Sequence, residues 1–305
     1  MKIIVAGGTG WLGSVLTASL VADQHEVIIL TRRPPVATPE AAERHVSWDG
    51  RTLGPWVTEV AGADAIVNLS GAPIAPARWT TARKRTLRAS RIESTRTLVA
   101  ALEATPRRPA VLVSASAIGY YGDRGDENVA ENDPPGHDFL AELCRDWEAE
   151  ATRATALGVR VVLPRLGVVL GPDGGALLPL AMISRFFLGG PIGTGRQWMP
   201  WVARTDVVAL LRFALTRPEV SGPINVVSPN PVRNEELARE IGKALGRPSW
   251  ISAPPFMLRL ILGEFADTLL TGQRALPTTA LKLGFEFTRP TLSGALATTL
   301  RPPSP

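Results

Sequence analysis

The amino-terminal stretch MKIIVAGGTGWLG constrains the fold more than any other segment, because it places glycines at positions 7, 10 and 13 directly after an apolar run. The run at 2–6 is short and β-branched, which is typical of a buried parallel strand. Glycines permit a tight turn and a close approach to a pyrophosphate, and a following helix supplies N–H groups. This context predicts a dinucleotide-binding loop, although a plain turn from strand to helix is the alternative. The candidate binding residues are Gly7, Thr9, Gly10, Trp11, Leu12 and Gly13.

Further short apolar runs alternate with helical patterns along the first two thirds of the chain. Strands are expected at 26–30, 65–69, 110–114, 160–163 and 224–227, and helices at 11–23, 83–104 and 138–157. This alternation predicts an α/β fold, a doubly wound parallel sheet of the Rossmann type. We expect an NADP-binding domain at 1–170, with a return segment at about 202–228. Residues 171–201 and 229–305, richer in Gly and Pro, are expected to form a small C-terminal substrate or lid domain.

The end of the second expected strand indicates which dinucleotide is bound. An NAD site normally carries an Asp or Glu there for the ribose hydroxyls. This chain has Leu30-Thr31-Arg32-Arg33 instead, and arginine pairs with phosphate in a bidentate manner. We therefore predict NADP(H), with Arg32 on the 2′-phosphate, Arg33 as a further candidate there, and Thr31 as another cofactor-binding residue. The alternative is a pair of solvated surface arginines.

Composition excludes several other classes of protein. The chain has 305 residues, a net charge of +5 and 45% hydrophobic residues, and its one cysteine, Cys144, cannot form an intrachain disulfide. The three histidines lack metal-ligand spacing, so no metal is expected. The positive charge is spread along the chain, so we expect a small-molecule substrate and no nucleic-acid partner. The apolar stretch at 176–193 is interrupted by Arg185 and by Gly and Pro, so no membrane partner is expected and the cytoplasm is the expected compartment. The sequence does not decide whether the chain forms a homodimer.

Several segments resemble the extended short-chain dehydrogenase/reductase superfamily. The GxxGxxG spacing, the Asn68–Gly71 segment, the serine-bearing stretch from Ser114 and the Pro164-Arg165 segment all fit that pattern. Ser90-Arg91-Ile92 and the Trp198–Trp201 segment narrow the resemblance to its epimerase-family, sugar-nucleotide epimerase-like subgroup, and the match covers nearly the whole chain. The resemblance implies further cofactor contacts at Asn68, Leu69, Ser70, Gly71, Arg91, Ser114, Pro164 and Arg165.

The stretch DFLAELCRDWE departs from the superfamily's pattern. Active members of the superfamily use a Tyr-x-x-x-Lys pair on this helix, and counting back from Glu148 puts Leu140 and Cys144 at those two positions. Leucine has no proton to transfer, and a neutral thiol has no charge to lend. The subgroup shares this departure.

The residues that remain as catalytic candidates, without the Tyr-Lys pair, are one serine and two tyrosines. Ser116 matches the hydroxyl that polarises a substrate carbonyl, and Tyr120 and Tyr121 follow it closely. A tyrosine needs a neighbouring cation to transfer a proton at neutral pH, and Arg165 is the candidate. The alternatives are a structural tyrosine pair and serines that only hydrogen-bond within the protein.

Two functions follow from this pattern. The first is an NADP(H)-dependent oxidoreductase or epimerase-like enzyme for a small substrate, a sugar nucleotide being one candidate. The second is a non-catalytic NADP(H)-binding redox sensor. Among other residues, Cys144 is expected to be a buried small hydrophobe, Glu148 a surface or capping carboxylate and Asp206 a structural acceptor. Trp198 and Trp201 are expected to form either a substrate platform or a hinge.

Overall fold

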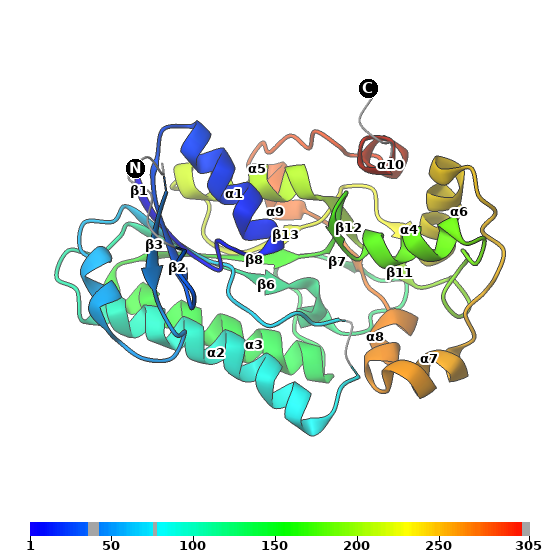
Figure 1. Cartoon of the computed structure of the whole chain (residues 1–305), viewed down its shortest axis with the longest axis horizontal. Coiled ribbons are helices and arrows are strands. Elements are labelled where there is room, and N and C mark those ends of the chain that lie inside the picture. The colour runs from blue at the N-terminus through cyan, green and yellow to red at the C-terminus, as the bar shows by residue number, and fades with distance from the viewer. Residues whose placement is uncertain (36–42, 76–77, 301–305) are drawn as a thin grey trace.

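The protein is built around one parallel sheet, as a computed structural model that describes residues 1–35, 43–75 and 78–300 shows (Figure 1). The strand order is β13-β8-β5-β4-β1-β2-β3, and β6 also pairs with β8. All of these pairings are parallel. The strands are β1 (Lys2–Ala6), β2 (Glu26–Thr31), β3 (Glu43–Ser47), β4 (Ala65–Asn68), β5 (Val111–Ser114), β6 (Ser116–Ala117), β8 (Arg160–Leu166) and β13 (Gly222–Val226).

Helices cover both faces of the sheet because successive strand residues point in opposite directions. Ile3 and Val5 of β1 join a core with α1 (Trp11–Ala22) and α5 (Arg204–Thr216). Ile4 joins a second core with α2 (Thr81–Glu103), α3 (Phe139–Thr152) and the 3-10 segments η1 (Pro55–Glu59) and η3 (Arg153–Leu157). Figure 1 shows α1 and α5 on one side of the strands and α2 and α3 on the other. The predicted doubly wound α/β fold is confirmed.

The sequence predicted the buried strands better than the edge strand. The expected run at 2–6 coincides with β1, and the other expected strands differ from β2, β4, β5, β8 and β13 only at their ends. Strand β3 was not predicted, since its sequence ERHVS is polar and lies partly exposed at the edge of the sheet.

A second apolar core gathers beside the carboxyl ends of the main strands. It joins Leu170, Trp201 and Leu237 with residues of α4 (Leu177–Arg185) and α10 (Leu292–Leu300). The small elements of this part are β9 (Val168–Gly171), β10 (Gly174–Gly175), β11 (Trp198–Met199), β12 (Trp201–Ala203), β14 (Val232–Arg233), α6 (Asn234–Leu245), α7 (Pro255–Leu262), α8 (Phe265–Leu270) and α9 (Thr278–Lys282). Two more short elements, β7 (Asn128–Val129) and β15 (Arg274–Ala275), pair with each other. The hairpin β9–β10 spans the boundary expected at residue 170, and the domain division stays a prediction.

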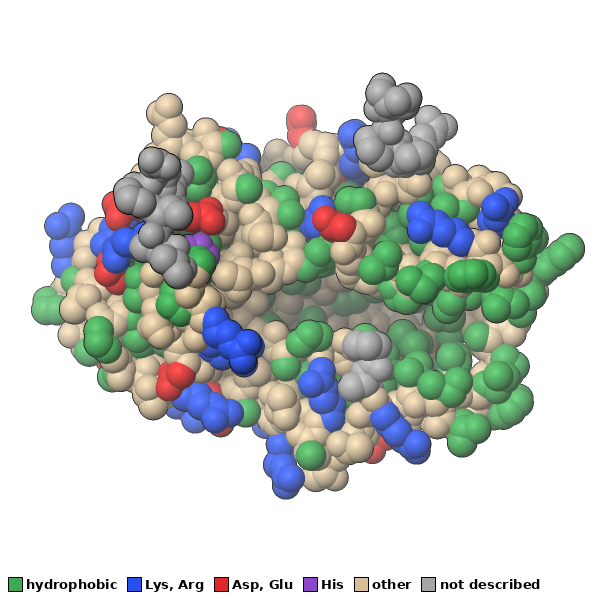
Figure 2. Space-filling view, viewed as in Figure 1, with side chains coloured by type: hydrophobic (Ala, Val, Ile, Leu, Met, Phe, Trp, Pro, Cys, Tyr) green, Lys and Arg blue, Asp and Glu red, His purple; other side chains and the backbone are tan. Residues whose placement is uncertain are grey.

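The strand order reverses direction between β1 and β4, and this reversal positions the site. Loops that follow two such strands diverge and leave a crevice at the carboxyl edge of the sheet, where ligands of doubly wound folds bind. Here these loops are residues 7–10 and, among the described residues, 69–75 and 78–80. Figure 2 shows a hollow in this part of the molecule. Within the described ranges, no helix is long and apolar enough to cross a membrane.

Candidate functional site

The glycine loop after β1 lies against the loop after β4 with no room for side chains. Gly7 has a φ of +80°, and a Cβ there would lie 2.8 Å from the carbonyl carbon and oxygen of Leu69. A Cβ on Gly13 would lie 2.2 Å from the carbonyl oxygen of Gly7. Helix α1 begins at Trp11 with Gly10 as its N-cap, and no side chain caps it. Its first N–H groups are therefore available to a ligand at the crevice.

The side chain of Trp11 is directed at the hairpin β9–β10, so its expected cofactor contact would have to come from its backbone. Its indole N–H donates to Asp173 at 2.7 Å, and Arg204 lies 4.9 Å from the ring centroid. A Cβ on Gly174 or Gly175 would lie 2.6 Å from the indole. These glycines make room for the ring, so Trp11 joins the cofactor loop to the second core. Only its backbone remains a candidate for ligand binding.

Arg32 and Arg33 follow β2 and are exposed at the carboxyl edge of the sheet. In the part of the chain that the structure describes, neither guanidinium group forms an ion pair. Thr31 accepts a backbone hydrogen bond from Arg33 at 3.4 Å. Both cations are exposed at the end of the second strand, where the ribose of a dinucleotide is expected.

The side chain of Asn68 holds the loop that follows β4 in place. Its amide donates to Thr95 at 2.9 Å and to Ser114 at 3.2 Å, and its side-chain oxygen accepts from the backbone of Ser70 at 3.1 Å. Trp147 donates to the same Thr95 hydroxyl at 2.9 Å. Asn68 and Ser114 are fully buried, so their side chains support the loop and do not offer polar atoms to a ligand. Leu69, Ser70 and Gly71 are the residues of this segment with exposed surface.

A buried ion pair holds the segment that contains both tyrosines. Arg165 of β8 donates from Nε and Nη2 to the two oxygens of Glu148 on α3, each at 2.8 Å. Its Nη1 donates to the Tyr121 hydroxyl at 2.8 Å and to the carbonyl of Glu131 at 3.0 Å. The guanidinium also lies 3.5 Å from the ring centroid of Tyr120. The expectation that Glu148 is a surface or capping carboxylate is wrong, since it is the buried partner of Arg165.

The same network engages three of the residues expected at the site. Ser116 donates to Glu148 at 2.6 Å and is 1% exposed. The Tyr121 hydroxyl donates to Asn225 at 2.8 Å, and Tyr121 is 0% exposed. Burial raises the pKa of the Tyr121 phenol to about 12, although Arg165 acts in the opposite direction. These contacts favour the structural alternatives for Ser116 and Tyr121, and they place Arg165, expected at the cofactor, in the same buried network.

Pro164 is another expected contact that the structure buries. It is buried in β8, opposite Ile224 of β13. The superfamily's sequence pattern therefore locates β8 correctly. The side chain of Pro164, however, packs within the sheet, and that of Arg165 forms the buried ion pair.

Tyr120 is the tyrosine that keeps exposed surface. It lies in η2 (Ile118–Tyr121) after β6, and its ring packs edge-on against Tyr121. Its neighbour Gly119 touches the start of α3, because a Cβ there would lie 3.2 Å from Cβ of Leu140. Tyr120 thus emerges beside the helix position where the superfamily carries its tyrosine.

The expected lysine position on α3 is buried and neutral. Cys144 is buried, and burial raises the pKa of its thiol to about 12, so it is a small core residue, as expected. Asp138 caps the helix by accepting from Ala141 at 2.8 Å, and Leu143 and Trp147 are buried along its inner face.

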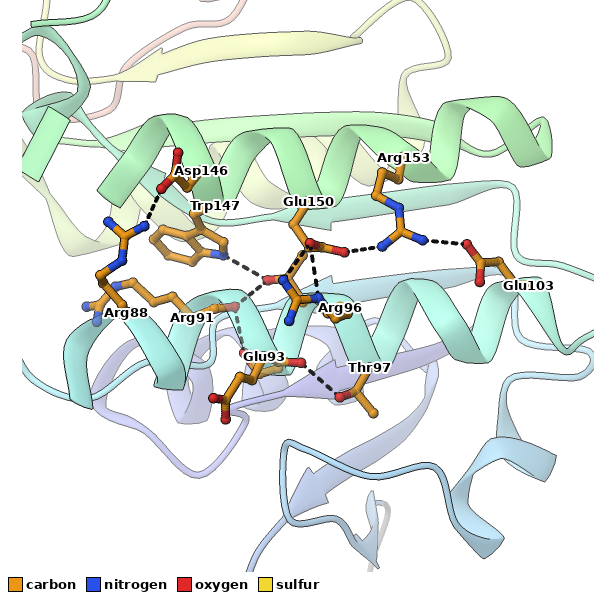
Figure 3. Close-up of polar contacts among 12 residues, drawn as sticks. Arg88, Arg91, Glu93, Arg96, Thr97, Glu103, Asp146, Trp147, Glu150 and Arg153 are labelled. Carbon is orange, nitrogen blue, oxygen red and sulfur yellow. Dashed lines mark hydrogen bonds and ion pairs between the residues drawn. The ribbon is translucent and has the colours of Figure 1, made fainter. Parts of the chain in front are cut away.

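Arg91 brings a positive charge towards this position from the neighbouring helix α2. Its guanidinium donates to the carbonyls of Leu87 at 3.2 Å and Ala72 at 3.0 Å, and it lies 5.3 Å from the ring centroid of Trp147. Figure 3 shows Arg91 running beside Trp147 between α2 and α3, whereas Arg88 pairs with Asp146. Burial lowers the pKa of Arg91 to about 10, and within the described ranges it pairs with no carboxylate. A Cβ on Gly71 would lie 3.1 Å from its Cζ.

The tryptophans near Pro200 have different surroundings. Trp201 is fully buried in the second core and donates to the carbonyl of Asn230 at 3.0 Å, so it forms no substrate platform. Trp198 is half-buried, and the guanidinium groups of Arg233 and Arg274 lie 4.6 and 4.5 Å from its ring centroid. Asp206 accepts from the backbones of Thr288 and Arg289 at 2.9 and 3.0 Å, which is the structural role expected for it.

A glycine loop at the reversal point of a parallel sheet defines a Rossmann-type nucleotide-binding fold. The model of the NAD dependent epimerase/dehydratase family matches residues 3–227, and a domain of unknown function, DUF1731, matches residues 253–299. The chain belongs to the NAD dependent epimerase/dehydratase family, as an atypical extended short-chain dehydrogenase/reductase. The resemblance drawn from the sequence is confirmed.

Named relatives extend over nearly the whole chain. "Epimerase family protein SDR39U1 homolog, chloroplastic" of Arabidopsis thaliana is 43% identical and covers 94% of this chain and 83% of its own. "Epimerase family protein Mb2239" of Mycobacterium bovis is 43% identical and covers 98% of both. The crystal structure of human epimerase family protein SDR39U1 (isoform 2) with NADPH is 34% identical, with a TM-score of 0.90, and covers 98% of this chain and 99% of that one.

The buried ion pair generates a prediction about stability. Glu148→Gln keeps the shape of the side chain but leaves the charge of Arg165 buried without a counter-charge. We expect the free energy of unfolding to fall by about 3–5 kcal/mol, measured by urea denaturation followed through tryptophan fluorescence. Glu93→Gln, which breaks the exposed pair with Arg51, is the control, and we expect a loss below about 1 kcal/mol.

A second substitution separates the charge from the shape. Glu148→Gln combined with Arg165→Met removes both charges, and we expect it to recover part of the lost stability. Equal losses for Glu148→Gln and Glu93→Gln would show that the buried pair does not have the role assigned to it.

Proposed function

We propose that the protein is an NADP(H)-dependent oxidoreductase or epimerase-like enzyme with an atypical active site. The observation that carries this proposal is the glycine loop, which leaves the N–H groups of α1 uncapped beside Leu69 and within reach of the crevice. The relative with an NADPH-bound structure, human SDR39U1, supports the choice of cofactor. A small carbonyl- or alcohol-bearing compound is the proposed substrate, and a sugar nucleotide is one candidate.

The residues present fit an NADP cofactor at both phosphate groups. The main-chain groups of 7–13 would hold the pyrophosphate, since any side chain at Gly7 or Gly13 would clash with the loop backbone. Arg32 and Arg33 would hold the 2′-phosphate, because both are exposed cations at the end of β2 where NAD-specific sites carry a carboxylate. Leu69, Ser70 and Gly71 would line the other side of the crevice.

The bound cofactor supplies hydride chemistry at a substrate carbon. Tyr120 is the proposed holder of the accompanying proton, because its hydroxyl makes no hydrogen bond to the residues that the structure describes and its neighbour Gly119 touches Leu140. The guanidinium of Arg165 lies over its ring and would hold the ring in place. Ser116 and Tyr121 then position Tyr120 through Glu148 and Arg165, without touching substrate.

Arg91 is the proposed substitute for the missing lysine. The superfamily's lysine binds the nicotinamide ribose from the position that Cys144 occupies here. Arg91 approaches the same place from α2, and its charge acts on the Cys144 thiol. Its buried guanidinium has only carbonyl and aromatic partners within the described ranges, so ribose hydroxyls or an anion would satisfy it further.

A non-catalytic redox sensor is the second candidate, and the contact of Trp11 favours it. A ligand bound to the N–H groups of α1 would contact Trp11, whose indole donates a hydrogen bond to Asp173. Asp173 is in turn paired with Arg204 at the start of α5. Occupancy of the cofactor loop would thus be transmitted to the second core without any turnover, and Leu140 and Cys144 would be tolerated in such a protein.

The cofactor assignment predicts that NADPH binds more tightly than NADH. Arg32→Ala and Arg33→Ala should each reduce this preference about tenfold or more, since a charged hydrogen bond to phosphate contributes about 1.5–3 kcal/mol. Titration of nicotinamide fluorescence measures both constants. Arg107 is exposed before β5, at the amino edge of the sheet, so Arg107→Ala should leave both dissociation constants unchanged. Equal affinity of the parent protein for NADH and NADPH would refute the assignment.

The role of Arg91 predicts a difference between two ligands. Arg91→Gln should weaken the binding of NADP⁺ about tenfold or more, because a charged hydrogen bond is lost. It should leave the binding of adenosine 2′,5′-bisphosphate unchanged, since that ligand lacks the nicotinamide half. Isothermal calorimetry measures both, and equal weakening of the two ligands would place the effect of Arg91 elsewhere.

The catalytic assignment predicts different results for the two tyrosines. NADPH oxidation across a panel of carbonyl compounds and sugar nucleotides identifies a substrate, and Tyr120→Phe should then lower kcat about a hundredfold while KM changes little. Tyr121→Phe should mainly lower stability, because its hydroxyl bonds Asn225 and Arg165. Unchanged kcat in Tyr120→Phe would exclude Tyr120. Tight NADPH binding with no turnover would favour the sensor.

A further inference from the structure

Helix α7 is apolar, yet the fold buries none of its residues. It reads PFMLRLIL, and Phe256, Leu260 and Ile261 are 71%, 72% and 63% exposed. Helices of a folded protein normally bury their apolar side chains, and an exposed apolar surface of this kind marks a site of interaction. Only Arg259 interrupts the run, and it is paired with Asp267.

A second segment adds to the same surface. Phe186, Phe187 and Leu188 follow α4 and are 72%, 54% and 57% exposed, and Trp250 is 79% exposed. Ile251 donates its N–H to the carbonyl of Gly189 at 3.1 Å, which aligns 186–192 with 247–253. The position of Gly193 against Pro255 continues this alignment to α7.

These side chains form one surface at an end of the molecule. Figure 2 shows hydrophobic side chains gathered at this end, above and below the open side of the hollow. In Figure 1 the ends of α4 and α6 lie on one side of it and α7 on the other. We call the exposed residues of 186–188, 250–251 and 256–261 the apolar end. Its large apolar side chains are mostly exposed.

Positive charges lie next to the apolar end. Arg247 lies 4.6 Å from the ring centroid of Phe187, and Arg78 donates to the carbonyl of Leu260 at 3.4 Å. Lys84 pairs with Glu264 beside α7, so the start of α2 approaches the same surface. Arg78, Arg185 and Arg247 have no carboxylate partner among the residues that the structure describes.

We propose that the apolar end docks on an anionic lipid bilayer. Protruding aromatic and aliphatic side chains insert into the interface of a bilayer without any need for shape complementarity, and adjacent arginines attract anionic headgroups. The net charge of +5 acts in the same direction. This differs from the expectation of no membrane partner, because that expectation concerned a spanning segment. The proposal is independent of the cofactor and of turnover.

Sedimentation with lipid vesicles tests this proposal. The full chain should sediment with vesicles of phosphatidylcholine and phosphatidylglycerol, and less with phosphatidylcholine alone or at high salt. Phe256→Glu combined with Leu260→Glu should lower the bound fraction about tenfold or more, since two apolar side chains no longer insert. Leu53→Glu combined with Leu281→Glu is the control, because these leucines are 51% and 50% exposed outside the apolar end and the change in charge is the same.

Thermal melting and NADPH titration establish that each variant is folded. A parent protein that stays in the supernatant with both kinds of vesicle overturns the proposal, and so does equal sedimentation of the two double variants. Light scattering after size-exclusion chromatography tests whether a second copy of the chain covers this surface instead. If the parent is a dimer, fails to bind vesicles, and becomes a monomer on Phe256→Glu with Leu260→Glu, the surface is covered by a second copy and the bilayer proposal is wrong.

Discussion

The buried charge of Arg165 is the constraint on which the site depends. A guanidinium group in a protein interior must find a counter-charge and acceptors for its N–H groups, since removal from water costs several kcal/mol. Arg165 finds Glu148 on α3, the hydroxyl of Tyr121 in η2 and the carbonyl of Glu131. One side chain therefore joins β8, α3, η2 and the segment before α3, and this network fixes where Tyr120 and Ser116 can lie.

This network explains how the site can lack the usual tyrosine and lysine and remain ordered. Where other members of the superfamily place reacting groups on α3, this chain has Leu140 and Cys144, which pack against η2 and the core. The polar groups that remain are supplied from elsewhere: Tyr120 from η2 and Arg91 from α2. The cofactor loop is unaffected, because its geometry depends on the contact of Gly7 with Leu69 and not on α3.

The sequence predicted what depends on local pattern and missed what depends on contacts between distant segments. The β-branched runs and the glycine spacing are local, so β1, the loop and the fold class followed directly. Three features depend on residues from different segments and leave no local signal in the sequence. These are the pairing of Arg165 with Glu148, the contact of Trp11 with Asp173, and the burial of Ser116 and Tyr121. The apolar end was missed because helical periodicity does not tell a buried apolar helix from an exposed one.

A crystal structure of the protein grown with NADP⁺ would show directly whether the glycine loop holds the cofactor. We expect the cofactor along residues 7–13 with its 2′-phosphate at Arg32 and Arg33, while Ser116 stays hydrogen-bonded to Glu148 and Tyr120 alone among the three hydroxyl residues faces the nicotinamide. A structure without the cofactor at this loop would exclude the proposed binding mode. So would one in which Ser116 or Tyr121 leaves the Arg165 network to contact the nicotinamide.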